Sequence, residues 1–271
     1  MSATDVLETQ RDLGADLRSA PRRLVVTWQH PESRGIHPIG LLTFDGNSYE
    51  FRYIRHALSV KDFSPLIGFP HLDAPYTSDD LFPLFAQRVM DPRRADFHRY
   101  VTRLGLSGDT TPWEQLARSG GRRVGDTLQL FPEPVVQDGE MTCAFLAHGI
   151  RHIGERPIEL ADCAVTVTRD QVERALQSLE VGDELDVVAE PGNAVNPNAL
   201  LVASDGTPVG YVPNLLVDDL ANLLQRSELR AVVELVNGPE APWHLRLLGR
   251  LHASSVGDFK FFRDSGWKPL S

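Results

Sequence analysis

The chain has 271 residues, of which 42% are hydrophobic and 24% are charged, and its net charge is −10. It is therefore long enough for two globular domains, and its composition excludes wholesale disorder. No apolar run approaches the roughly 20 residues that span a bilayer, and an acidic chain is a poor match for broad wrapping of nucleic acid by a basic face.

The N-terminal 21 residues are polar, carry both charge signs and lack the apolar stretch of a signal peptide. We expect a flexible arm on a cytoplasmic protein. Cys143 and Cys163 are twenty residues apart, which does not match any short metal-binding or redox motif. The simplest expectation for both is a core thiol in a reducing compartment.

The first half alternates short strands with helices. A β-branched run predicts a first strand, and two further strands should meet at a tight turn over Asp45-Gly46-Asn47. A proline-rich stretch should be extended and irregular. Helical periodicity then predicts three helices, followed by a strand and a linker. In chain order these segments are 22–29, 38–51, 63–77, 78–90, 93–105, 111–121, 122–132 and 135–141.

The second half of the sequence predicts many short strands and two helices. We expect strands over 141–154, 161–167, 183–191, 198–204, 208–213, 231–237 and 243–253. The helices should cover 169–179, with Val172, Leu176 and Leu179 facing inward, and 215–225, capped by Asn214. Such a pattern fits a small β-barrel or sandwich.

The predicted fold class is therefore α+β, with two small mixed domains, the second an OB-type β-barrel with accessory helices. The predicted division is an arm at 1–21, a domain at 22–134, a linker at 135–141, a domain at 142–256 and an aromatic, basic tail at 257–271.

Signals for catalysis are weak. The chain has no Gly-x-Ser-x-Gly elbow, no phosphate-binding loop ending in Gly-Lys-Ser/Thr and no His-Glu-x-x-His pair. His148 and His152 would share one face of a predicted strand, but zinc needs at least one more protein ligand. Asp218 and Asp219 fit better as partners of a helix dipole and water. We expect no enzymatic activity, no cofactor and no metal.

The loop from Glu190 to Asn198, EPGNAVNPN, is unusually rich in proline, glycine and asparagine. A purely architectural account is complete: a stiff loop and a hairpin that position a helix. A recognition surface is the alternative.

The same region resembles the HIRAN domain. Four elements carry the resemblance in order and spacing, over roughly Thr142 to Ala253: Gly149-Ile150-Arg151, Glu190-Pro191-Gly192-Asn193, Asn198-Ala199-Leu200 and Val209-Gly210-Tyr211. The resemblance implies a modified OB-like barrel that takes the 3′ end of single-stranded DNA.

The resemblance also implies residue roles. Arg151 would pair with a backbone phosphate, and His152 stands where a stacking aromatic is expected. Asn193 and Asn196 would lie on the loop that meets the terminal sugar or base, with Asn198 at its end, and Tyr211 would line the pocket. Two positions depart from the pattern: Ile153 replaces a second aromatic, and Asn196 replaces a carboxylate.

The first half resembles the N-terminal subdomain of HipA-type kinases, over about Arg23 to Pro132. The matching pieces are Gly40-Leu41-Leu42, Tyr49-x-Phe51-x-Tyr53, Ser64-Pro65-Leu66, Leu81-Phe82-Pro83-Leu84-Phe85, Arg103-Leu104-Gly105-Leu106 and Gly120-Gly121-x-x-Val124-Gly125. This resemblance implies a protein-interaction module, because the residues of a kinase core have no place in the chain.

The leading hypothesis is a non-enzymatic, cytoplasmic protein that binds single-stranded DNA ends and a protein partner. The segment from Arg151 to Arg250 contains eight arginines and sixteen carboxylates, which gives it a net charge of −8. A DNA site in this segment must therefore be small and local. Arg93, Arg94 and Arg99 are further candidates for phosphate contacts, or simply a solvated helix face. The alternatives are a protein–protein adaptor of a toxin–antitoxin or defence system, and an unrecognised nuclease or hydrolase.

Overall fold

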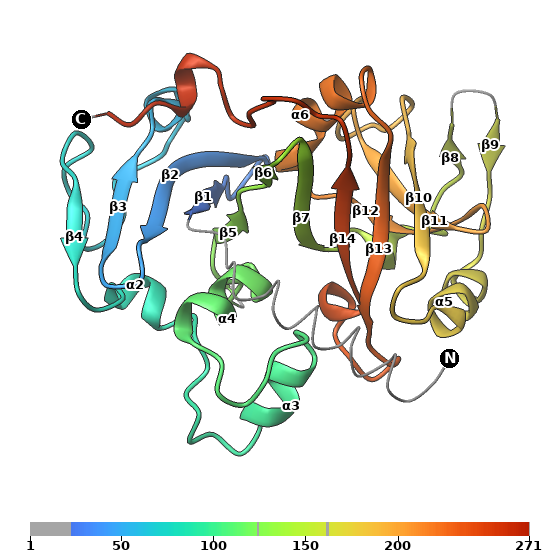
Figure 1. Cartoon of the computed structure of the whole chain (residues 1–271), viewed down its shortest axis with the longest axis horizontal. Helices are drawn as coiled ribbons and strands as arrows, with labels where there is room; N and C mark the ends of the chain where they lie inside the picture. The colour runs from blue at the N-terminus through green and yellow to red at the C-terminus, as the bar shows by residue number, and fades with distance from the viewer. Residues whose placement is uncertain (1–22, 124, 161–162, 271) are drawn as a thin grey trace.

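The structure, a computed structural model, describes residues 23–123, 125–160 and 163–270. Over these residues the chain forms two units, each built on an antiparallel sheet with helices beside it (Figure 1). The predicted α+β class is confirmed. The expected arm at 1–21 lies outside the described residues, and the domain boundaries stay a prediction.

The first unit is built on a five-stranded sheet in the order β4-β3-β2-β1-β5. Asp45 organises the expected turn between β2 and β3, because its Oδ1 accepts hydrogen bonds from the amides of Asn47 and Ser48, both at 2.8 Å. Aromatic side chains such as Phe51, Tyr53 and Phe69 fill the core. The strands are β1 (Arg23–Gln29), β2 (Ile36–Phe44), β3 (Tyr49–Tyr53), β4 (Tyr76–Ser78) and β5 (Leu128–Pro132).

Two helices of this unit are shorter than predicted. Pro83 has no amide hydrogen and is tolerated only in a first turn, so the helix begins there and not at Ser78. Asp91-Pro92 separates it from the next helix, since a residue before proline disfavours helical geometry. In α4, Thr111 and Glu114 form a capping box, which the sequence analysis did not predict. The helices are η1 (Arg55–Ser59), α2 (Pro83–Ala86), α3 (Phe97–Thr102) and α4 (Pro112–Ser119).

The segment predicted as a linker, 135–141, is mostly paired strand. β6 (Val135–Gln137) forms a hairpin with the start of β7 (Glu140–Leu146), through a turn in which Asp138 and Gly139 both have positive φ. Proline and acidic residues suggested a linker, but the hairpin satisfies the backbone hydrogen bonds of the segment.

The second unit contains a sheet in the order β12-β11-β10-β13-β14-β7-β6. Its closure depends on one pair: His148, just past β7, exchanges backbone hydrogen bonds with Tyr211 of β12, both at 2.9 Å. This bridge joins the two sides of the sheet and closes a barrel. The remaining strands are β10 (Glu184–Ala189), β11 (Leu200–Ser204), β12 (Thr207–Tyr211), β13 (Leu229–Val236) and β14 (Leu247–Ala253).

Short elements surround this barrel. Val172 and Leu176 of α5 are buried in its core as predicted, as is Leu179, which directly follows the helix. Asn214 is the first residue of α6 and makes no capping bond, so its predicted capping role is wrong. These elements are η2 (Ile150–His152), β8 (Ile158–Glu159), β9 (Ala164–Val165), α5 (Arg169–Ser178), α6 (Asn214–Leu224), η3 (Trp243–Leu245) and η4 (Ser265–Trp267).

Three further expectations in this unit are wrong. The strand expected over 141–154 ends at Leu146, because Gly149 adopts φ 65° and turns the chain into η2. His148 and His152 therefore do not share a strand face. Cys143 is buried as expected, but Cys163 is exposed.

Polar and apolar contacts join the two units. Glu234 of β13 accepts hydrogen bonds from Arg118 of α4 and from Arg250 of β14, and all three side chains are buried or nearly so. Leu104 of the first unit packs with Leu146, Leu245 and Leu248 of the second. We call this contact region the seam.

The C-terminal tail ties the units together a second time. In Figure 1 it runs across the top of the molecule from the barrel to β3. Phe261 is buried in the barrel core, whereas Pro269 forms a bridge with Ile54 and the amide of Leu270 donates to the carbonyl of Tyr53 at 3.1 Å. The tail is therefore a strap rather than a loose extension.

Candidate functional site

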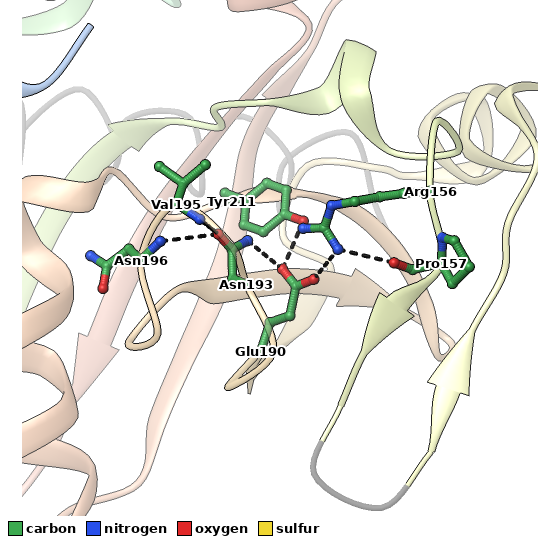
Figure 2. A network of polar contacts seen from close by, with 7 residues as sticks. All are labelled: Arg156, Pro157, Glu190, Asn193, Val195, Asn196 and Tyr211. Atoms are coloured by element: carbon green, nitrogen blue, oxygen red, sulfur yellow. Dashed lines mark hydrogen bonds and ion pairs between the residues drawn. The ribbon is translucent and has the colours of Figure 1, made fainter. Parts of the chain in front are cut away.

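The loop between β10 and β11 is organised by one buried carboxylate. The Glu190 side chain is 0% exposed and accepts three hydrogen bonds: from Arg156 Nη1 at 2.7 Å, from Asn193 Nδ2 at 2.6 Å and from Tyr211 Oη at 2.9 Å (Figure 2). Burial alone would raise the pKa of Glu190, but these donors hold it below its ordinary value. The carboxylate is thus kept charged inside the fold.

The asparagines of the loop mainly shape the loop itself. Asn193 Oδ1 accepts from the amides of Val195 and Asn196, at 2.9 and 3.1 Å. Asn196 Oδ1 in turn accepts from the amide of Asn198 at 2.9 Å. These are successive Asx-type turns, which asparagine favours. Asn193 is therefore committed through both ends of its amide, and Asn198 Nδ2 donates to Asp218 of α6 at 2.8 Å.

Tyr211 connects this loop to the turn that carries Arg151. Its backbone closes the barrel against His148, and its hydroxyl binds Glu190. Its ring lies so close to Gly149 that a Cβ there would meet Tyr211 Cδ2 at 2.9 Å. Burial and the neighbouring carboxylate raise the pKa of Tyr211, so the phenol stays a hydrogen-bond donor at all ordinary pH values.

Arg151 and His152 lie exposed in η2, directly after Gly149. Arg151 Nε donates to His152 Nε2 at 2.8 Å, and His152 Nδ1 lies 2.8 Å from Glu155 Oε2. Because Nε2 accepts, the neutral ring carries its proton on Nδ1 and donates to Glu155. The ring is thereby oriented on both sides. Ile153, the departure noted above, is 3% exposed and belongs to the barrel core.

Two residues of this network were not predicted as members of the candidate site. Glu190 was noted only as part of a motif, although it is the centre of the network. Arg156 was not singled out: its side chain is 42% exposed, and only Nη1 is bonded, to Glu190 and to the carbonyl of Pro157, among the described residues. No local signal marks Arg156, since its partner lies in a different strand–loop segment.

The other candidate cations lie elsewhere. Arg93 and Arg94 are exposed and pair with their neighbours Asp91 and Asp96, at 2.6 and 2.9 Å. Arg99 is an exposed residue of α3. In Figure 1, α3, which contains Arg99, lies at the bottom of the view, whereas β10 and β11, which flank the Glu190 loop, lie at its right side.

The described residues contain no group of three His, Cys, Asp or Glu side chains arranged to hold a metal ion. No helix in the described part of the chain is both long and apolar enough to cross a membrane.

Comparison with known proteins gives two structural likenesses. A protein from Lactobacillus plantarum matches 42% of this chain and 97% of its own, with 19% identity and a TM-score of 0.31. The HIRAN domain of human HLTF matches 44% of this chain and 80% of its own, with 15% identity and a TM-score of 0.27. No protein-family model and no curated protein matches the chain.

Proposed function

We propose that the barrel unit binds the end of a single-stranded nucleic acid, as a binding module and not as an enzyme. The observation that carries this proposal is the position of Tyr211, which joins an arginine-bearing turn to a rigid, amide-rich loop. Cations for phosphates and fixed amide groups for a terminal sugar or base then border one small surface.

The electrostatics support a small site. The barrel unit is acidic, yet it carries Arg151 in η2 and Arg156 shortly after that helix. Arg156 Nη1 donates to Glu190, and the other guanidinium nitrogens of Arg156 can donate hydrogen bonds to an anion. A local cationic surface in an acidic unit favours an end or a short segment over a long duplex.

The rigidity of the loop supports the same proposal. Asn193 and Glu190 hold the loop in one shape before any ligand binds, which lowers the entropic cost of binding. Asn196 Nδ2 makes no hydrogen bond within the described residues, so it can donate to a ligand oxygen.

We further propose that the first unit recruits a protein partner, as its resemblance to an interaction subdomain implies. Ile67 and Leu58 are 90% and 64% exposed there. Exposed apolar side chains of this size favour a protein contact.

Fluorescence anisotropy with a labelled single-stranded oligonucleotide tests the DNA proposal, at low and at physiological salt. An oligonucleotide with a free 3′ hydroxyl should bind more tightly than one with a 3′ phosphate, and salt should weaken both. Arg151→Ala should cost about 1–3 kcal/mol of binding free energy, the size of a charge-assisted hydrogen bond.

Arg226→Ala is the matched control, since Arg226 is an exposed arginine beyond α6. Equal affinity of wild type and Arg151→Ala, with both folded, contradicts the proposed site. An absence of binding at either salt leaves the protein-adaptor function as the remaining proposal.

A further inference from the structure

Arg122 of the first unit is an unneutralised cation at the seam. It lies in the turn between α4 and β5, with part of the residue exposed and part of it lining the seam. No carboxylate among the described residues pairs with it, whereas Arg88 pairs with Asp126 and Arg118 with Glu234. The next residue, Arg123, donates to Gln87 at 2.7 Å.

Arg122 faces the second unit. It lines a cavity of about 30 Å³ at the seam together with His148, the residue that closes the barrel. His148 precedes Arg151 by three residues, so this wall of the cavity leads to the turn that carries Arg151. Burial first, and then the charge of Arg151, lower the pKa of Arg122. Burial, Arg122 and His244 together lower the pKa of His148 to about 4.

Arg169 adds a third cation to this region. Its Nη2 donates to the carbonyl of Arg151 at 3.4 Å, and its guanidinium lies 5.8 Å from the ring centre of Trp243. The Trp243 indole therefore contacts the Arg169 guanidinium by a cation–π interaction. Arg246 contacts the same ring at 5.4 Å, but Glu173 neutralises it with two bonds of 2.8 Å.

Arg122, Arg151 and Arg169 form no ion pair with a carboxylate among the described residues. Glu155 is the carboxylate whose pKa is lowered by Arg151 and Arg169, after its main partner His152. Like charges brought together by folding oppose folding, so an anion that binds all three is favoured.

We propose that Arg122, Arg151 and Arg169 form a phosphodiester track across the seam, which leads a single strand from the Glu190 loop onto the first unit. This inference rests on the proposed function and adds the direction that the bound strand takes. A single strand carries a phosphate at each nucleotide, so it can contact guanidinium groups that come from three separate segments of the chain.

The test compares single strands of about 4 and about 12 nucleotides, both within the range of site sizes on small barrels. Both carry a free 3′ hydroxyl and a label at the 5′ end. Wild type should bind the longer strand more tightly. Arg122→Ala should weaken the longer strand about 5-fold to 10-fold, the effect of one phosphate contact, and leave the shorter strand unchanged.

The salt dependence gives a second readout. Loss of one phosphate contact on a single strand lowers the slope of log K against log salt by about 0.7. Arg122→Lys should restore most of that slope, because the charge returns. Arg123→Ala is the matched control, because Arg123 lies in the same turn as Arg122 and its guanidinium donates a hydrogen bond to Gln87.

The outcomes separate the two proposals. If wild type binds neither strand, the proposed function fails. If wild type binds both strands and Arg122→Ala leaves both affinities unchanged, the end site stands and the track is wrong. If Arg123→Ala loses as much affinity for the longer strand as Arg122→Ala does, the track is also wrong, since a general change of charge would then explain the result.

Discussion

The hydroxyl of Tyr211 donates a hydrogen bond to Glu190 at 2.9 Å, and the Glu190 side chain has no exposed surface. One residue belongs to the strand that closes the barrel and the other to the end of β10. Barrel closure and the shape of the β10–β11 loop are therefore linked through a single buried carboxylate.

Removing that carboxylate should destabilise the fold. In Glu190→Ala, the donors Asn193 and Tyr211 lose their acceptor and Arg156 loses its counter-charge. Because Arg156 is partly exposed, water screens part of this loss, and we expect about 2–3 kcal/mol in the free energy of unfolding. Urea denaturation measures it. Glu180→Ala, at an exposed position, is the control, and an equal midpoint for both variants would refute the role of Glu190.

Asn193 should control the order of the loop. Asn193→Ala removes the acceptor for the amides of Val195 and Asn196 and one donor to Glu190. We expect faster hydrogen exchange at these two amides and a loss of about 1–2 kcal/mol in stability. Exchange measured by NMR checks the first point. Unchanged protection of both amides would mean that the backbone alone holds the loop.

His148 should make stability depend on pH. Burial first, then Arg122 and His244, lower its pKa from 6.5 to about 4 in the folded state. The unfolded chain therefore binds more protons between these values. The contribution is fully present above pH 6.5, declines as pH falls towards 4, and levels off below.

We expect this contribution to be about 2 kcal/mol, less than the full shift would give, since the side chain is only half-buried. The comparison of His148→Gln with wild type by urea denaturation from pH 4 to 7 measures it. The variant should show a flatter profile over this window. Parallel profiles would assign the pH dependence to other groups.

The ion pairs at the seam should couple the two units. Glu234→Gln leaves Arg118 and Arg250, which are 10% and 12% exposed, without their shared counter-charge. Breaking a buried ion pair in this way costs about 3–5 kcal/mol. We expect thermal unfolding to separate into two transitions in calorimetry.

Glu184→Gln is the control for the seam, because Glu184 and Arg230 form an exposed pair that contributes less than about 1 kcal/mol. A single, unshifted transition in Glu234→Gln would show that the strap and the apolar contacts couple the units without this carboxylate.

Local patterns in the sequence determined several elements. Periodicity placed α5 and its buried face, and Asp45 with Gly46 placed the first hairpin. The lengths of α2 and α3 were wrong although the relevant prolines were visible, because apolar periodicity was given more weight than Pro83 and Asp91-Pro92. Gly149 was likewise a visible stop for the strand expected through His152.

The candidate site depended on contacts that only the tertiary structure decided. The resemblance to the HIRAN domain singled out Arg151, Tyr211 and the loop asparagines, whereas the residues alone indicated only a stiff loop rich in proline, glycine and asparagine. The sequence did not indicate that Glu190 would meet Arg156, or that Arg122 would line a cavity with His148 at the seam. Hydrophobic spacing encodes which face of an element is buried, but the partner of a buried charge is set by barrel closure and by the packing of distant segments.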